Sequence, residues 1–384
     1  MAGPVAAAGE KGSMKVVVER AALLRALGHV QSVVERRNTI PILSNVLLQV
    51  DGEGLRLMAT DLDLQVVEAC EANVEAPGAT TVPAHTLYEI IRKLPDGAQV
   101  TLAQADARVT VTAGRARFQL QTLPREDFPV IGESDLPTLF RLAASELRDI
   151  IDRTRFAIST EETRYYLNGI FLHAPAGPQG AKVLRAVATD GHRLARIELP
   201  LPEGAADMPD VIVPRKCVAE VRKLLDERDG EVEIALSATK IRFHIGAAVL
   251  TSKLIEGSFP DYSRVIPTAN ERLLRIDPQT LAEGVDRVTA IASDKTRAVK
   301  LTLDQDRVTL SVTSPENGTA SEDLPAIYSA PGFDVGFNSR YLLDILAQVE
   351  GDQVEVHLAD AAAPTLIRAH DRAPALYVLM PMRV

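Results

Sequence analysis

The feature that most constrains this chain is an internal repeat, and its clearest copies share a Phe-Pro step. The chain reads "PREDFPVI" at 124–131 and "IEGSFPDYSRVI" at 255–266, so Phe128 and Phe259 lie 131 residues apart. Other stretches recur in the same order: "ATD" at 59–61 and 188–190, then "VPAHTLYEIIRKL" at 82–94, "VPRKCVAEVRKLL" at 213–225 and, more loosely, "FNSRYLLDILAQV" at 337–349. This order predicts three divergent copies of one module of about 125 to 130 residues.

The spacing of the copies sets the expected domain boundaries. We expect modules over 14–136, 137–270 and 271–384, and a disordered extension or tag over 1–13, which lacks the basic start and apolar stretch of a signal peptide. No apolar run is long enough to cross a membrane. The two cysteines, Cys70 and Cys217, form neither a disulfide framework nor a metal-ligand spacing, which favours a reducing cytoplasm.

Each module contains two helical patterns separated by alternating strands. Apolar residues recur at helical spacing over 21–34, 84–94, 145–156, 215–226, 279–291 and 339–349. Between these patterns, stretches such as "AVKLTLDQDRVTLSVTS" alternate polar with apolar residues, as half-buried strands do. We therefore predict an α+β fold in which each module packs two helices on one face of a mostly antiparallel sheet.

The sequence contains none of the common catalytic or nucleotide-binding motifs. It has no GxxxxGK[ST] loop, no GxSxG elbow and no HExxH pair among its seven histidines. Asp61 and Asp63 share one strand face, where a solvated turn is the simpler interpretation and a metal site the alternative. "TDGHRLAR" at 189–196 fits a turn at Asp190-Gly191, with a catalytic pair of Asp190 and His192 as the alternative. We expect no metal, nucleotide or other cofactor.

Five segments together resemble the bacterial beta sliding clamp family, the processivity subunit of the replicative DNA polymerase III holoenzyme. They are "RYYLNG" (164–169), "VATDGHRLA" (187–195), "VIVPRK" (211–216), "TSKLIEGSFPDYSRVI" (251–266) and "YVLMPMRV" (377–384). The resemblance runs from Met14 to Val384. It implies the DNA clamp fold, a head-to-tail homodimeric ring around duplex DNA, and a non-catalytic role as a tether for the polymerase and other DNA-processing proteins.

A ring gives a physical account of the net charge of −10, which by itself argues against binding to nucleic acid through bulk charge. A closed ring stays on DNA without tight contacts, and basic residues on the helices can keep its hole mildly positive. The resemblance implies DNA contacts at Arg37, Tyr165 and Tyr166, and we add Arg215 and Lys216. Two positions depart from the family pattern, because His85 replaces an arginine and Glu161 replaces a glutamine. We expect neither to contact DNA.

The resemblance also implies a pocket where short peptides of the polymerase, the clamp loader and repair proteins dock. The matching positions are Leu167, Thr189, Gly191, His192, Arg193, Leu194, Pro260, Arg264, Val265, Asn338, Tyr341, Val378, Met380, Pro381, Met382 and Arg383. Leucine, valine, proline and methionine suit an adaptable apolar groove. We expect Arg193, Arg264 and Arg383 to form its rim, although "MPMRV" can also be read as a plain closing strand.

The resemblance implies a dimer seam between the last strand of the first module and the end of the first helix of the third module. We expect Phe118 and Leu120 of one chain to meet Ile291 and Ala292 of its partner, close to Asp294 and Lys295. Ala292 is smaller than the leucine usual in the family, so we expect a less apolar seam.

Two other classes of function remain open from the sequence. The first is an enzyme that uses Asp190 and His192, in which replacing His192 by alanine would abolish turnover; in a docking protein it would only weaken peptide binding. The second is a repeat-built scaffold that does not bind DNA. Charge reversal of Arg37 with Lys216 would leave the interactions of such a scaffold unchanged.

Overall fold

The computed structural model describes residues 14–132, 134–226, 228–293 and 297–384. By their internal contacts these residues form two compact units: the described residues up to Ser145 with those of Ala219–Leu254, and those of Glu146–Val218 with those of Ile255–Val384. Residues 1–13, for which we expected an extension, lie outside the described part of the chain. The second sequence copy thus contributes strands to both units.

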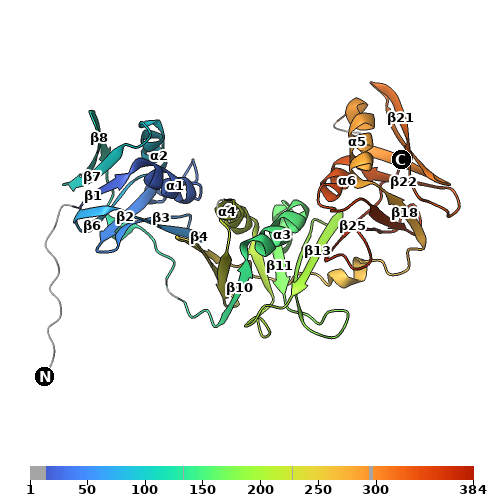
Figure 1. The fold of residues 1–384 in the computed structure, drawn as a ribbon, viewed down its shortest axis with the longest axis horizontal. Coiled ribbons are helices and arrows are strands. Elements are labelled where there is room, and N and C mark those ends of the chain that lie inside the picture. The colour runs from blue at the N-terminus through green and yellow to red at the C-terminus, as the bar shows by residue number, and fades with distance from the viewer. Residues whose placement is uncertain (1–13, 133, 227, 294–296) are drawn as a thin grey trace. The chain divides into compact units, whose positions relative to one another are not determined.

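The first unit contains two sheets and the first pair of helices (Figure 1). The smaller sheet has the order β5 (Asn73–Ala76), β1 (Lys15–Glu19), β7 (Gln99–Ala105), β8 (Arg108–Ala113), β9 (Ala116–Gln121). The larger has the order β10 (Thr138–Ala143), β15 (Glu231–Leu236), β16 (Lys240–Ile245), β17 (Ala248–Lys253), β4 (Leu64–Cys70), β3 (Gly54–Thr60), β2 (Asn45–Asp51), β6 (Gly78–Pro83). Two short 3₁₀ turns, η1 (Pro41–Ser44) and η2 (Arg125–Asp127), complete it.

The second unit repeats this arrangement. Its larger sheet has the order β18 (Arg272–Ile276), β23 (Val354–Leu358), β24 (Thr365–Arg368), β25 (Ala375–Leu379), β13 (Arg193–Pro200), β12 (Val183–Thr189), β11 (Gly169–His173), β14 (Val211–Pro214). Its smaller sheet has the order β21 (Gly318–Pro325), β20 (Arg307–Ser314), β19 (Ala298–Asp304), β22 (Phe333–Asn338). The 3₁₀ turns are η3 (Arg155–Ala157), η4 (Glu162–Leu167), η5 (Tyr262–Val265) and η6 (Thr289–Ile291).

Each eight-stranded sheet joins two sequence copies through one antiparallel strand pair. In the first unit, β17 of the second copy pairs with β4 of the first copy. In the second unit, β25 of the third copy pairs with β13 of the second copy. We call these pairs the first joint and the second joint. On one side of each joint stand equivalent strands, β10, β15, β16 and β17 in the first unit and β18, β23, β24 and β25 in the second. On the other side stand β4, β3, β2 and β6 in the first unit and β13, β12, β11 and β14 in the second. The sequence repeat is therefore also a repeat of topology.

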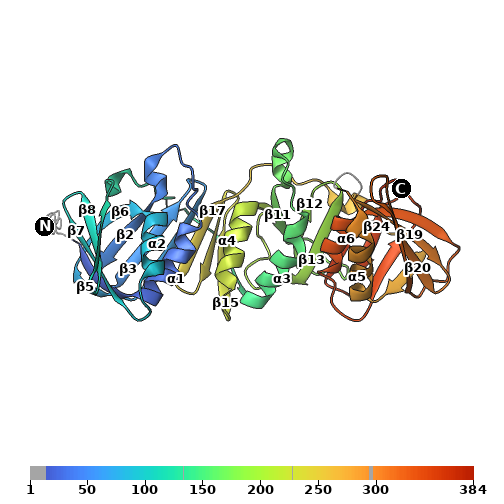
Figure 2. The same cartoon turned by 90° about the horizontal axis from the view of Figure 1, so that it is seen from above.

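The predicted helices all form, two in each copy. They are α1 (Arg20–Gln31), α2 (Ala84–Lys93), α3 (Ala144–Thr154), α4 (Arg215–Leu225), α5 (Pro278–Val288) and α6 (Ser339–Leu346). Figure 2 shows α1 and α2 side by side over strands of the first unit, and α5 and α6 side by side in the second. In α1, Leu23, Leu27 and Val30 are fully buried at helical spacing, as expected of a helix that covers a sheet.

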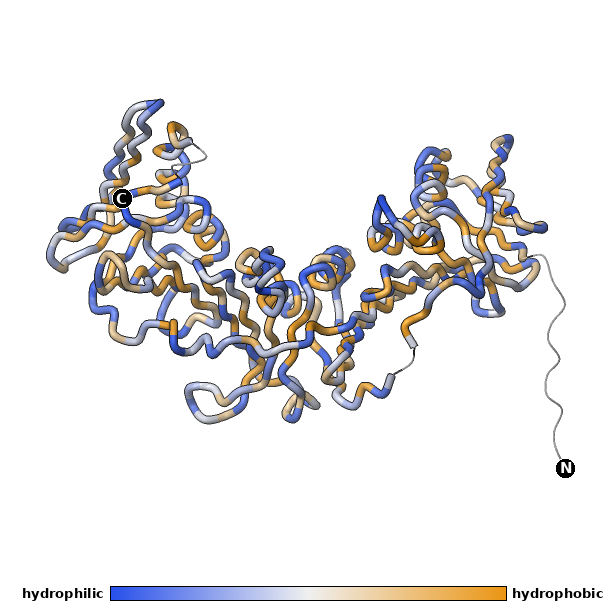
Figure 3. Tube along the Cα trace, turned by 180° about the vertical axis from the view of Figure 1, so that it is seen from behind, coloured by the Kyte–Doolittle hydropathy of each residue, from blue (hydrophilic) through white to orange (hydrophobic). Residues whose placement is uncertain are grey.

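Four helices, α1, α3, α5 and α6, end two or three residues before the sequence pattern indicates, for a local reason. The Val33 and Val34 amides bond the carbonyls three residues back, so the chain after Gln31 continues in tighter turns. In the same way α5 gives way to the 3₁₀ turn η6 before the predicted end at 291. Apolar periodicity persists through a 3₁₀ turn, and it therefore extends the predicted helix. In Figure 3 the hydrophobic stretches run along the strands, whereas many turns between them are hydrophilic.

Candidate functional site

The densest group of sequence-predicted site residues lies in the second unit, around the turn between β12 and β13. Thr189 Oγ1 donates to the carbonyl of Arg193 at 2.7 Å, and Asp190 Oδ1 accepts the backbone amides of His192 and Arg193 at 2.9 and 3.0 Å. Gly191 has a φ of 88°, a conformation that favours glycine. A Cβ at Gly191 would also lie 2.7 Å from Nη1 of Arg164. The expected turn is therefore confirmed, and it leaves His192 exposed.

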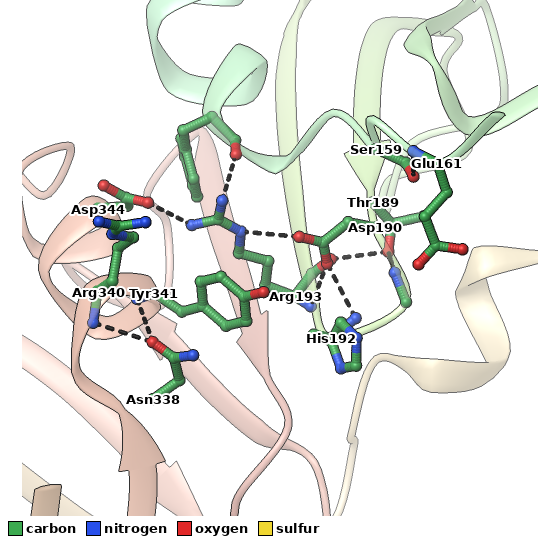
Figure 4. Close-up of polar contacts among 12 residues, drawn as sticks. Ser159, Glu161, Thr189, Asp190, His192, Arg193, Asn338, Arg340, Tyr341 and Asp344 are labelled. Atoms are coloured by element: carbon green, nitrogen blue, oxygen red, sulfur yellow. Dashed lines mark hydrogen bonds and ion pairs between the residues drawn. The ribbon is translucent and has the colours of Figure 1, made fainter. Parts of the chain in front are cut away.

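Arg193 fixes this turn to the third sequence copy (Figure 4). Its guanidinium contacts Asp190 at 3.1 Å, Asp344 at 2.5 Å and the carbonyl of Phe156 at 2.6 Å. It also lies over the ring of Tyr341, 4.2 Å from the centroid. Its side chain is only 10% exposed. Two carboxylates already balance its charge, so its contacts give Arg193 a structural role in this turn, and its place at the rim of the pocket stays a prediction.

The same contacts speak against a catalytic pair of Asp190 and His192. One oxygen of Asp190 accepts two backbone amides, and the other accepts Nε of Arg193. The carboxylate is thus engaged by the turn itself rather than directed at the imidazole. The His192 ring instead stacks on the Tyr341 ring, with the ring centroids 6.1 Å apart.

The segment 255–266, which contains the second Phe-Pro step, is held to the sheet by aromatic rings. Phe259 stacks on Phe171 with 4.8 Å between centroids. The hydroxyl of Tyr262 accepts a hydrogen bond from Nη1 of Arg185 and lies 2.9 Å from Nε2 of His173. Because that hydroxyl accepts from Arg185, its proton is free to be donated to the neutral imidazole of His173. Burial lowers the pKa of His173 to about 4, which keeps the imidazole neutral.

This anchored segment carries three of the predicted pocket residues. Pro260 and Val265 are exposed, and Arg264 pairs with Asp261 at 2.8 Å. The hydrogen bond from Ser263, followed by that from Arg264, lowers the pKa of the Asp261 carboxyl. Beneath the segment, Tyr262 belongs to a buried cluster with Leu194 and Val378. The structure therefore brings these positions together around one apolar base.

The last residues of the chain complete the site. The Met380 amide donates to the carbonyl of His192 at 2.9 Å, and the Met382 amide donates to that of Gly336 at 2.8 Å. The backbone of "MPMRV" therefore continues the strand pairing, while the side chains of Met380 and Met382 remain 37% and 39% exposed; their role in a pocket stays a prediction. Pro381 is half-buried and Arg383 is exposed.

The remaining predicted pocket residues have supporting positions. Leu167 is buried, and its carbonyl accepts the amide of Ser159. Asn338 caps α6 by accepting the amides of Arg340 and Tyr341. Sequence reasoning missed Asp344, although it follows Tyr341 by three residues, the spacing that places side chains on one helix face.

The predicted DNA contacts come from both units. In the first unit, Arg37 is exposed beyond the end of α1. In the second, Tyr165 is 55% exposed and its ring meets that of Tyr166 edge to face, with 5.8 Å between centroids. Arg215 is exposed at the start of α4. Its amide donates to the carbonyl of Asn168, the residue that follows the 3₁₀ turn η4 with Tyr165 and Tyr166. Lys216, next to Arg215, is half-buried.

The two positions that depart from the family pattern are engaged within the chain. Nδ1 of His85 lies 2.8 Å from the Gln31 side chain, and Nε2 lies 3.1 Å from the carbonyl of Val34. The carboxylate of Glu161 accepts two hydrogen bonds from the guanidinium of Arg164, from Nε at 2.8 Å and from Nη2 at 2.5 Å. The hydrogen bond from Arg164 lowers the pKa of the Glu161 carboxyl, which therefore stays ionised.

The predicted seam residues differ in exposure. On the edge strand β9, Phe118 is 37% exposed but Leu120 is buried within its own module. Ile291 and Ala292 are half-buried at the end of η6, and the carbonyl of Ile291 accepts the Asn317 side chain at 3.1 Å. Asp294 and Lys295 lie outside the described residues.

Within the described residues, no set of three or more His, Cys, Asp or Glu side chains is placed to hold a metal ion. Across the same part of the chain, no helix is both long and apolar enough to span a membrane.

Comparison with known proteins matches the three copies to three domains of one family. The models of the N-terminal, central and C-terminal domains of the DNA polymerase III beta subunit match residues 14–132, 141–261 and 263–383. The beta sliding clamp of Caulobacter vibrioides (strain NA1000 / CB15N) is 52% identical over 97% of this chain and 100% of its own length. That of Escherichia coli (strain K12) is 36% identical over 97% of this chain and 100% of its own length.

Solved structures agree with this assignment. A DnaN sliding clamp from Bartonella birtlesii bound to griselimycin has a TM-score of 0.94 and 50% identity, covering 97% of this chain and 100% of that chain. A C. crescentus beta sliding clamp with PEG bound to a putative beta-motif tethering region has a TM-score of 0.95 and 52% identity, and the match covers 98% of this chain and 100% of that chain. The family resemblance found in the sequence and the predicted three-domain α+β clamp fold are confirmed. The chain belongs to the DNA polymerase III beta subunit family, the beta sliding clamps.

Proposed function

We propose that two copies of this protein close head to tail into a ring around duplex DNA and tether the replicative polymerase to its template. The ring has no catalytic step of its own. It acts by topology, so a polymerase bound to it cannot diffuse away from the DNA. This role places the protein in the bacterial cytoplasm, with a clamp loader as the partner that opens the ring.

The observation that carries the proposal is the joint formed twice within the chain. Each joint pairs the last strand of one copy, β17 or β25, with an earlier strand of the preceding copy, β4 or β13. Strands β4 and β13 occupy equivalent positions in their copies. The strands left over are β9 of the first copy and β21 of the third, and each is an edge strand of its sheet. If β9 of one chain pairs with β21 of another, the same joint forms a third time.

Such a contact is heterologous, because it uses a different surface on each partner, and it has to close on itself to give a finite ring. Phe118 on β9 and Ile291 beside β21 are then on the two sides of the seam. Leu120, being buried in its own module, contributes little apolar area to it, and Ala292 contributes less than a leucine would.

Electrostatics fit a ring that slides rather than grips. Several helix cations are already paired with carboxylates: Arg92 with Glu89, Arg153 with Glu350, Arg222 with Asp226, Lys223 with Glu220, and Arg287 with Glu322. Pairing of this kind lowers the number of phosphate contacts and with it the salt dependence of binding. We propose Arg37, Tyr165, Tyr166, Arg215 and Lys216 as the residues that contact DNA.

We propose the site around His192 as the place where partner peptides dock. Met380, Met382 and Val265 offer exposed apolar side chains beside the buried cluster of Leu194 and Val378. A short extended segment with apolar side chains can cover them, and methionine adapts to segments of different shape. The polymerase, the clamp loader and other DNA-processing proteins are the expected partners.

The test is retention on circular and on linearised duplex DNA at high salt, after loading with a cognate clamp loader and ATP. We expect the protein to stay on the circle and to leave once the circle is cut. Equal loss from both substrates would indicate ordinary salt-sensitive binding, and equal retention would indicate a contact-based grip. Either result would overturn the ring.

A further inference from the structure

The first joint carries a surface hollow that corresponds in the repeat to the site around His192. Its volume is about 250 Å³, and its walls include Leu62, Pro129, Val130, Ile131, Lys240 and Lys253. All of these residues belong to the first unit. None of them belongs to the peptide site proposed above.

The turn at the edge of this hollow has the same hydrogen bonds as the turn at Asp190. Thr60 Oγ1 donates to the carbonyl of Leu64 at 2.9 Å and accepts the amide of Leu62 at 3.1 Å. Asp61 Oδ1 accepts the amides of Asp63 and Leu64 at 3.0 and 2.7 Å. The corresponding four distances in the 189–193 turn are 2.7, 3.2, 2.9 and 3.0 Å.

The strand that crosses the joint repeats the pattern as well. The Lys253 amide donates to the carbonyl of Asp63 at 2.8 Å, as the Met380 amide donates to that of His192 at 2.9 Å. Lys253 therefore occupies the position of Met380. The first joint thus keeps the backbone of the docking site and replaces an apolar side chain with a cation.

Leu62 occupies the position of Gly191 at an energetic cost. Its φ is 83°, close to the 88° of Gly191, and a leucine in the left-handed region is strained. Its side chain is 41% exposed, so burial of the rest offsets only part of that strain. A strained residue that presents an apolar side chain to solvent at a hollow is a feature that occurs at binding sites.

The opposite wall is rigid and apolar. Phe128 is buried, and the Ile131 amide donates at 2.9 Å to the side chain of Gln65, itself buried. These anchors hold the short segment between them in place, while Val130 within it is 57% exposed. The hollow therefore has a fixed shape with exposed apolar side chains on two sides.

The charges at its rim favour an acidic ligand. Lys240 donates to two neutral oxygens, Oγ of Ser134 at 2.5 Å and the carbonyl of Gly132 at 3.4 Å, so these contacts do not balance its charge. Lys253 pairs with Asp63 at 3.0 Å, and its side chain is 52% exposed. A carboxylate that approaches the rim gains a charge-assisted hydrogen bond from Lys240, and it can share the Lys253 ammonium, which has three donor hydrogens, with Asp63.

We propose that the hollow at the first joint is a second docking site, which takes a short extended segment of a partner protein with alternating acidic and apolar residues. The apolar side chains lie between Leu62 and Val130, and the carboxylates lie against Lys240 and Lys253. The two joints then select different partners, because Lys253 replaces Met380. The comparison with the 189–193 turn rests on the proposed function, but the contacts that define the new site do not.

The test uses the full chain and a fluorescein-labelled pentapeptide, Asp-Leu-Asp-Leu-Asp, that carries a photoreactive benzophenone. Fluorescence polarisation measures its affinity, and mass spectrometry maps the cross-linked residues. The control peptides are Lys-Leu-Lys-Leu-Lys, which reverses the charge, and Asp-Ser-Asp-Ser-Asp, which removes the apolar side chains. We expect cross-links within 60–64 or 128–132, and at least tenfold weaker binding of both control peptides.

Two variants probe the site and a third serves as a control. Leu62→Gly copies the glycine of the second joint, which suits the left-handed backbone, so we expect it to fold normally and to bind the peptide at least tenfold more weakly. Lys240→Gln should weaken binding about threefold to tenfold. Met380→Ser changes only the second joint and should leave the cross-links at 60–64 unchanged.

Each contrary outcome overturns the second site. These outcomes are no measurable binding at millimolar peptide, equal binding of the charge-reversed peptide, or cross-links only around 189–194 and 378–384 with no effect of Leu62→Gly. Failure of the proposed function would show differently, as equal loss from circular and linear DNA, and it would leave the cross-linking result at the first joint unaffected.

Discussion

Arg193 offers the sharpest test of how the docking turn is held together. Replacing it with methionine keeps an apolar stem of similar length and removes the guanidinium, with its contacts to Asp190, Asp344 and the carbonyl of Phe156. Removing one partner of a buried ion pair typically costs about 3 to 5 kcal/mol. Asp344 is 38% exposed and can be hydrated again, and Asp190 keeps two backbone donors. We therefore expect a loss near the low end, about 3 kcal/mol.

The measurement is urea unfolding followed by circular dichroism, since the chain contains no tryptophan to report by fluorescence. A double-mutant cycle with Asp344→Asn isolates the pair, and we expect a coupling of about 1 to 2 kcal/mol because the two groups are in direct contact. Arg193→Lys is the matched control; it keeps the charge but not the planar fork, and should recover only part of the loss. A loss below about 1 kcal/mol for Arg193→Met would refute the structural role assigned to this residue.

Three further predictions follow from the burial, backbone and seam geometry. Burial holds the pKa of His173 at about 4, so protonation favours the unfolded chain, and the free energy of unfolding should fall by up to about 1.4 kcal/mol per pH unit as the pH drops from 6.5 towards 4. In pH-dependent urea titrations, His173→Gln should flatten that slope; an unchanged slope would contradict it. A Cβ at Gly169 would lie 2.2 Å from the carbonyl oxygen of Val213, so Gly169→Ala should destabilise the protein by more than about 2 kcal/mol in thermal melts, whereas Gly52→Ala, with open space around it, should not. Phe118→Asp should shift sedimentation from dimer to monomer at micromolar concentration; a dimer as stable as wild type would remove Phe118 from the seam.

Periodicity and repetition in the sequence were sufficient to predict much of the fold. The six helices were expected from apolar spacing, and the turn at Asp190 from the residues Thr189, Asp190 and Gly191. Helix ends such as the one after Gln31 were misplaced, because 3₁₀ turns keep the apolar pattern while changing the hydrogen bonds. Such an end is decided by backbone geometry, to which hydrophobic spacing is insensitive.

The candidate site was harder to predict, because its support comes from distant parts of the chain. Arg193 looked like a rim cation in the sequence, and only the positions of Phe156 and Asp344 give it a structural role. The pairing of His173 with Tyr262 spans 89 residues, and no local pattern indicates it. The hollow at the first joint was also missed: Asp61 and Asp63 were considered as an acidic pair, whereas the residue between them has the unusual backbone.

The repeated joint has a consequence for how the proposed ring responds to dilution. Both joints described above connect segments of one polypeptide, so their partners are held at the high effective concentration of tethered segments. The seam between β9 and β21 of separate chains depends instead on how many chains are present. Dilution should therefore dissociate the two chains at the seams while the joints inside each chain stay paired. A loader that opens the proposed ring to admit DNA would then open it most easily at a seam.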